Sequence, residues 1–175
     1  EYSVLSLAAP EVGARTQPGQ FVMVKPVGVT DPLLRRPFSV FEVLRDARGV
    51  ITGVSILDKR AGRSTRRLYD LEAGDVVSCL GPLGQPFKTV APLGRAGVVA
   101  GGVGLAPFAT LVEALAATKT DTTLFYGART GEEFLTSGRQ TSQQVVDTAM
   151  AAIGKSTPTV ISGLRNAVLA TGYRF

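Results

Sequence analysis

The chain has 175 residues, with 19 Lys and Arg against 14 Asp and Glu, which gives a formal net charge of +5. It has no histidine and a single cysteine, Cys79, which excludes Ser/His and Cys/His nucleophilic pairs, His-ligated zinc and any iron–sulfur cluster built from this chain alone. Chemistry would therefore depend on a bound cofactor. No apolar run reaches the roughly 18 residues that span a bilayer, so we expect a cytoplasmic protein without a membrane partner.

Residues 1 to about 90 predict short strands separated by turns. β-branched and aromatic residues recur at short spacing between Gly, Pro and Asp, a pattern typical of a small antiparallel barrel or sandwich. The segment RDARGV at 45–50 predicts the tip of a hairpin. The predicted strands lie in YSVLSLAAP, GQFVMVKPV, RRPFSVFEVL, VITGVSILDK and DVVSCLGPLG.

One helix interrupts this region, in the segment GRSTRRLYDLEAGD. Ser64 or Thr65 is the expected N-cap, Leu68 and Leu71 lie three residues apart, and Gly74 is the expected end.

From about residue 96 the pattern changes to an apolar strand, a glycine-rich turn and a helix, followed by a second apolar strand in TTLFYGART. This order predicts the start of a parallel βαβ unit. We place a domain boundary between Phe87 and Arg95, one α/β unit over 95–137 and an atypical tail over 138–175. That tail contains a predicted helix in QQVVDTAMAAIG.

The segment LLRRPFSV places two adjacent arginines beside a strand-forming run. Like charges at such a position cost stability unless an anion lies against them. Arg36 can donate two hydrogen bonds to a phosphate, and Phe38 offers a ring face. The pleat of a strand places Arg36 and Phe38 on one face and Ser39 on the other. The alternative is an edge strand with solvated arginines.

Two further segments predict anion sites. GRST at 62–65 begins the predicted helix, and GGVGLAP at 101–107 joins a strand to a helix. In both, backbone N–H groups converge where a phosphate could bind, and glycines allow close approach. An ordinary helix cap and a tight packing turn are the respective alternatives.

The series RPFS, GRST, GPLGQPF, GGVGLAP and FYGART resembles the ferredoxin-NADP reductase family of flavin-dependent reductases. Within it, PGQFVMVKP and TDPLLRRPFSV are most similar to electron-transfer subunits of NAD-dependent dihydroorotate dehydrogenases. The resemblance covers residues 1 to about 136. It implies a Greek-key antiparallel β-barrel that binds FAD over 1–90, followed by a partial Rossmann-like parallel α/β nicotinamide-binding domain over 95–137.

The resemblance also implies which residues bind each cofactor, and it assigns no catalytic side chain and no metal ligand. Arg36 would hold the FAD pyrophosphate beside Pro37, Phe38 would lie near the flavin and ribose, and Ser39 would approach flavin N5. The other assignments are Leu57, Asp58 and Lys59 on the adenine-side strand, Ser64 and Thr65 as amide donors to the phosphates, Gly101, Gly102, Gly104, Ala106 and Pro107 beneath the nicotinamide cofactor, and residues 126–129 beside it.

The implied function is transfer of electrons from NAD(H), as substrate, through FAD to a protein acceptor, which in the family is the dihydroorotate dehydrogenase catalytic subunit. The family's CGP-like motif and the cysteine-rich loop for its [2Fe-2S] cluster are missing here, and the chain begins with Glu1. We therefore expect a processed or truncated chain. The alternative to the electron-transfer function is a non-catalytic flavin-binding or interaction module. Nucleic-acid binding is disfavoured, because the arginines of 60–67 lack interleaved aromatic residues.

A glycine is usual in the family at the position of Ser64. Serine is tolerable there if its backbone φ is negative, and strained if φ is positive.

Overall fold

The computed structural model describes residues 2–28, 34–88 and 94–127. The chain divides after Phe87 into two compact units, which are described separately below. Arg129, the predicted helix in the tail and the rest of residues 128–175 lie outside the described residues.

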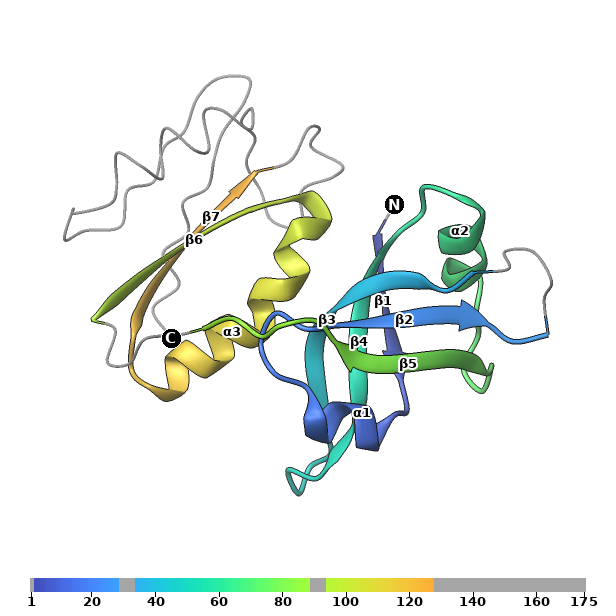
Figure 1. Ribbon diagram of the computed structural model, residues 1–175, viewed down its shortest axis with the longest axis horizontal. Coiled ribbons are helices and arrows are strands. Elements are labelled where there is room, and N and C mark those ends of the chain that lie inside the picture. Colours follow the sequence, from blue (N-terminus) through green and yellow to red (C-terminus); the bar gives the residue numbers. More distant parts are fainter. Residues whose placement is uncertain (1, 29–33, 89–93, 128–175) are drawn as a thin grey trace. The chain divides into compact units, whose positions relative to one another are not determined.

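The first unit is a five-stranded antiparallel sheet (Figure 1). Its strand order is β1-β4-β3-β2-β5. Three consecutive strands lie side by side and β1 joins the far side of β4, which is the Greek-key order. The five predicted strands are confirmed as β1 (Tyr2–Leu7), β2 (Phe21–Pro26), β3 (Arg36–Arg45), β4 (Ile51–Lys59) and β5 (Val77–Leu83).

Alternate residues of these strands form one apolar core. In β2, for example, Val22 and Val24 are buried while Phe21, Met23 and Lys25 are only partly so, because successive side chains of a strand point to opposite faces. The core residues, which come from four strands and one helix, are Leu7, Val22, Val24, Val40, Val54, Ile56 and Leu68.

The hairpin between β3 and β4 has the predicted tip. The carboxylate of Asp46 accepts hydrogen bonds from the backbone N–H groups of Arg48 (2.8 Å) and Val50 (2.9 Å). Gly49 adopts φ +79° there, a conformation that glycine adopts without steric cost.

A short helix, α1 (Pro10–Arg15), follows β1 and was not predicted. Its helical signals are Pro10 in the first turn, Glu11 near the N-terminus and Arg15 in the last turn. It packs on β4 through two glycines: a Cβ on Gly13 would lie 2.6 Å from the carbonyl oxygen of Gly53. Gly13 therefore has no room for a side chain, whereas a Cβ on Gly53 would collide with the carbonyl oxygen of Leu7 in β1.

The second helix, α2 (Arg63–Tyr69), begins before both predicted N-cap residues. It ends before Gly74, the predicted end. Its N-cap is Gly62, so the prediction of Ser64 or Thr65 as N-cap was wrong. The hydroxyl of Thr65 instead accepts hydrogen bonds from the backbone N–H groups of Gly62 (2.8 Å) and Ala61 (3.0 Å). Thr65 thus stabilises the helix start from inside its first turn.

The second unit has the predicted parallel βαβ arrangement. β6 (Arg95–Gly101) pairs in parallel with β7 (Asp121–Gly127). Between them lie a 3₁₀ turn, η1 (Gly102–Leu105), and the helix α3 (Ala106–Ala117). Within the described residues, no helix is both long and apolar enough to cross a bilayer.

Candidate functional site

A groove of about 580 Å³ lies between the start of β3 and the start of α2. Its volume is within the range of small-molecule sites, roughly 300–1,000 Å³. Of the described residues that line it, two are arginines and none carries a carboxylate. The lining residues are Arg36, Pro37 and Phe38 from β3, and Gly62, Arg63, Ser64 and Thr65 from the helix start.

The guanidinium of Arg36 reaches across this groove to α2. Its Nε donates a hydrogen bond to the hydroxyl oxygen of Ser64 at 3.3 Å. The neighbouring Arg35 instead donates to the hydroxyl of Ser78 on β5, from Nη2 at 2.7 Å and from Nε at 3.1 Å. The two adjacent arginines therefore have different partners, and only Arg36 lines the groove.

The backbone at Ser64 carries no strain. Among the described residues, Lys119 is the one non-glycine residue with a positive φ, so Ser64 occupies an ordinary helical conformation. Helix geometry leaves the first N–H groups of α2 without intrahelical partners. The N–H groups of Ser64 and Thr65 lie in this first turn and point toward the N-terminal end of the helix, where they can donate to a ligand.

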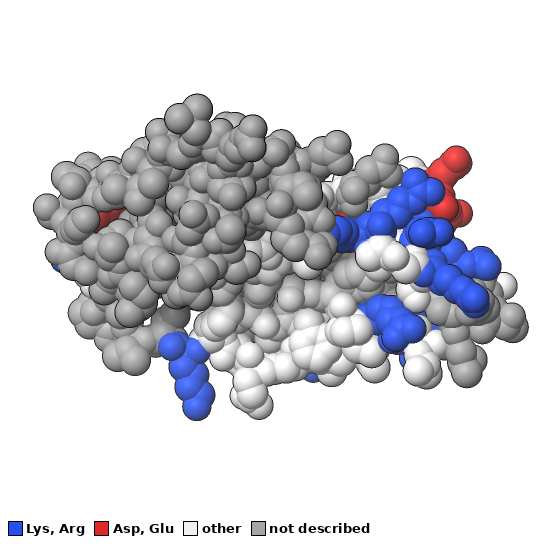
Figure 2. Space-filling view, turned by 90° about the horizontal axis from the view of Figure 1, so that it is seen from above, with Lys and Arg blue, Asp and Glu red and all other residues white. Residues whose placement is uncertain are grey.

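Basic side chains gather over the part of the first unit that carries α2 (Figure 2). Arg63, Arg66 and Arg67 of this helix are exposed. Arg60 lies 4.0 Å from the Asp70 carboxylate and 5.1 Å from the centre of the Tyr69 ring. The excess of positive charge favours an anionic ligand beside the groove.

Ser39 lies next to the groove in β3 but does not line it. It is half-buried and pairs with Phe21 of β2. This agrees with the alternation of faces along a strand. Its approach to flavin N5 stays a prediction.

The three predicted adenine-side residues of β4 lie outside the groove. Leu57 is buried, and the ammonium group of Lys59 lies 5.5 Å from the centre of the Tyr2 ring. The Asp58 side chain is fully buried, and within residues 2–28, 34–88 and 94–127 no group meets the geometry of a hydrogen bond to either carboxylate oxygen. Burial raises the pKa of Asp58 from 3.8 to about 6, and the backbone N–H of Lys59 offsets part of that increase. Contact of these residues with adenine stays a prediction.

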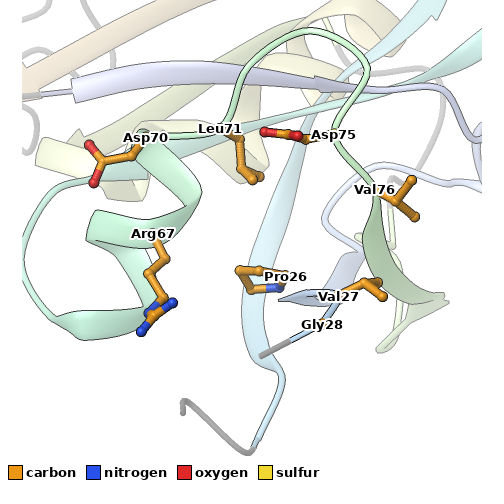
Figure 3. Close-up of a pocket in the computed structure, with 8 residues that line it drawn as sticks. All are labelled: Pro26, Val27, Gly28, Arg67, Asp70, Leu71, Asp75 and Val76. Carbon is orange, nitrogen blue, oxygen red and sulfur yellow. The ribbon is translucent and has the colours of Figure 1, made fainter. Parts of the chain in front are cut away.

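A second hollow, of about 480 Å³, lies where α2 ends (Figure 3). Pro26, Val27, Leu71 and Val76 form its apolar part. Asp70 points away from it, and Asp75 extends at its rim (Figure 3). The Asp75 carboxylate opposes the charge of Arg67 at this hollow, which disfavours a phosphate there. The groove at Arg36 is therefore the better candidate for an anionic ligand.

In the second unit, the glycine turn is held to β7 by a tyrosine. The hydroxyl of Tyr126, whose side chain is 2% exposed, donates to the carbonyl oxygen of Gly102 at 3.1 Å. Gly102 has φ +52°, whereas Gly101 is extended at φ −140°. Ala106 and Pro107 begin α3 directly after the turn. All five residues predicted for the nicotinamide turn thus lie in one strand-to-helix connection.

Replacing Gly102 by alanine should strain this turn. A Cβ in the left-handed region costs roughly 1–2 kcal/mol, so the free energy of unfolding should fall by about that amount. Gly104→Ala is the matched control, because its φ is not positive and a Cβ there would meet nothing within 4 Å. Urea unfolding followed by circular dichroism compares the variants. Equal stability of the two would contradict the role of Gly102.

The described residues offer no alternative redox or metal site. Burial raises the pKa of the Cys79 thiol, and the charge of Arg35 offsets part of that effect, so Cys79 is not activated as a thiolate. Among residues 2–28, 34–88 and 94–127, no group of three His, Cys, Asp or Glu side chains could hold a metal ion.

Sequence comparison identifies the second unit. Residues 98–151 match the family model of the oxidoreductase NAD-binding domain. The match continues past residue 137, where the sequence analysis ended the nicotinamide-binding unit, into the predicted tail.

Similarity to curated proteins extends over most of the chain. The dihydroorotate dehydrogenase B (NAD⁺) electron transfer subunit of Desulforamulus reducens is 39% identical over 131 residues, which are 75% of this chain and 48% of that protein. The corresponding subunit of Bacillus caldolyticus is 41% identical over 113 residues, 63% of this chain and 42% of the relative. The chain thus spans less than half the length of these relatives.

Solved structures show the same fold. An NADH-dependent reduced ferredoxin-NADP oxidoreductase of flavin-based electron bifurcation has a TM-score of 0.65 and 25% identity, with 78% of this chain and 47% of that chain covered. Phthalate dioxygenase reductase has a TM-score of 0.57 and 23% identity, over 75% of this chain and 40% of that chain. The predicted β plus α/β architecture is confirmed, and the chain is similar in sequence and fold to the ferredoxin-NADP reductase family.

Proposed function

We propose that this chain forms the FAD-binding and nicotinamide-binding parts of an oxidoreductase that passes electrons from NADH through FAD to a partner protein in the cytoplasm. Similarity to the curated relatives suggests the catalytic subunit of a dihydroorotate dehydrogenase as that partner. The observation that carries the proposal is the Arg36 guanidinium extended across the groove to Ser64.

The groove residues fit the diphosphate of FAD. Arg36 and Arg63 supply positive charge, and the N–H groups of Ser64 and Thr65 supply donors, without a carboxylate among the lining residues. A guanidinium can form two parallel hydrogen bonds to phosphate oxygens. The half-buried ring of Phe38 offers an apolar face on the same wall. The groove therefore suits a ligand that joins a diphosphate to an aromatic group.

The protein's own task in this function is positioning. When bound, FAD would supply the hydride and single-electron chemistry. Arg36 would neutralise and orient the diphosphate, Ser39 of β3 would lie beside the flavin, and the turn from Gly101 to Pro107 would hold the nicotinamide cofactor. Hydride transfer between two aligned rings requires orientation and no general base. The [2Fe-2S] cluster of the family is not assigned to this chain, which has one cysteine.

The full chain tests the proposal through the visible absorbance of the purified protein. We expect it to retain FAD and to lose the flavin absorbance rapidly when NADH is added without oxygen. Retention of FAD without this bleaching would favour the non-catalytic flavin-binding module. A colourless protein that does not bind added FAD would contradict both functions.

A further inference from the structure

We propose that Ser64 is a positioning residue, whose hydroxyl holds the guanidinium of Arg36 across the groove before any cofactor binds. This inference rests on the proposed FAD site. It assigns to the Ser64 side chain the orientation of the Arg36 guanidinium before FAD binds.

The hydrogen bond between these side chains joins an exposed residue to a buried one. Arg36 is exposed, and a long arginine side chain loses much rotational freedom when a ligand fixes it. Ser64 is 8% exposed, so its hydroxyl is a fixed point on α2. The bond from Arg36 Nε to Ser64 Oγ at 3.3 Å therefore restricts the guanidinium while the site is empty.

The geometry also determines which nitrogens remain for a ligand. Among the described residues, the Arg36 side chain donates a hydrogen bond to Ser64, and it does so from Nε. The two Nη groups stay available and can donate in parallel to two phosphate oxygens. The Ser64 hydroxyl accepts from Nε and keeps its own proton to donate. Arranging these donors in advance lowers the entropic cost of binding.

The experiment measures binding of FAD to the full-length apoprotein by quenching of flavin fluorescence. Ser64→Ala should raise the Kd by about 2- to 12-fold, the range expected when one side chain must be ordered on binding. Ser64→Thr, which keeps a hydroxyl, should restore most of the affinity. Ser78→Ala is the matched control, because it removes the equivalent serine partner of Arg35 outside the groove, and its Kd should be unchanged.

A double-mutant cycle distinguishes positioning from direct contact. If Ser64 acts through Arg36, Ser64→Ala should change the Kd little in an Arg36→Ala background. Equal effects of Ser64→Ala in both backgrounds would overturn the positioning role, as would a wild-type Kd in Ser64→Ala. In either case FAD binding by the wild type would leave the proposed function standing. Failure of the wild type to bind FAD would overturn both.

Discussion

Asp58→Asn is expected to remove a large pH dependence from the stability of the protein. The wild-type carboxyl is fully buried, and this burial raises its pKa from 3.8 to about 6 on folding. The folded state then holds a proton more tightly than the unfolded state. Stability from the neutral carboxyl is complete below pH 3.8 and is lost as the pH rises to about 6.

The size of this effect follows from the two pKa values. At 1.36 kcal/mol per pH unit, the difference corresponds to roughly 3 kcal/mol. Urea unfolding at several pH values from 4 to about 8 should show this loss in the wild type relative to Asp58→Asn. Glu11→Gln removes an exposed carboxylate of α1 and should follow the wild-type profile. If the free energy of unfolding depended on pH in the same way for the wild type and Asp58→Asn, the raised pKa of the buried Asp58 carboxyl would be refuted.

Arg36→Ala is expected to weaken FAD binding more than tenfold. The substitution removes charge-assisted hydrogen bonds to the diphosphate, each worth roughly 1.5–3 kcal/mol. Arg35→Ala is a stringent control, because it removes an identical charge one residue away whose guanidinium bonds Ser78 instead of lining the groove. Titration of the apoproteins with FAD provides the two Kd values.

The comparison separates a local contact from general electrostatic attraction. If Arg35→Ala lowered the affinity as much as Arg36→Ala, net charge would explain binding and the groove would not. We expect the Arg35 variant to stay within about fivefold of the wild type, since an exposed charge contributes only up to about 1 kcal/mol.

Much of the first unit follows from sequence because its strands have a regular apolar period. Val22 and Val24 of β2, and Val54 and Ile56 of β4, face one core, and that alternation is visible before folding. The helix α1 was missed because six residues with an interior glycine present no apolar stripe. The start of α2 was predicted wrongly because serine and threonine are common N-caps, whereas Thr65 here bonds back to Gly62.

The candidate site was predictable in part. Arg36, Pro37, Phe38, Ser64 and Thr65 were proposed from motifs, and the structure brings all of them to one groove. Gly62 also lines the groove but was not among the predicted site residues. Its position in the segment GRST could have indicated it. No sequence pattern could show the hydrogen bonds that depend on the fold. These are the bonds from Arg36 to Ser64, from Arg35 to Ser78 and from Tyr126 to Gly102.

The glycine contact between α1 and β4 has a consequence for the order of folding. An isolated helix shorter than about 12 residues is marginal in water, and an interior glycine lowers its stability by about 1 kcal/mol more. The six residues of α1 with Gly13 at their centre therefore form a helix only on a sheet that is already assembled. Replacing Gly13 by alanine would raise the helix propensity, but the added methyl group would collide with the carbonyl oxygen of Gly53. We therefore expect α1 to form after β4 has been assembled into the sheet.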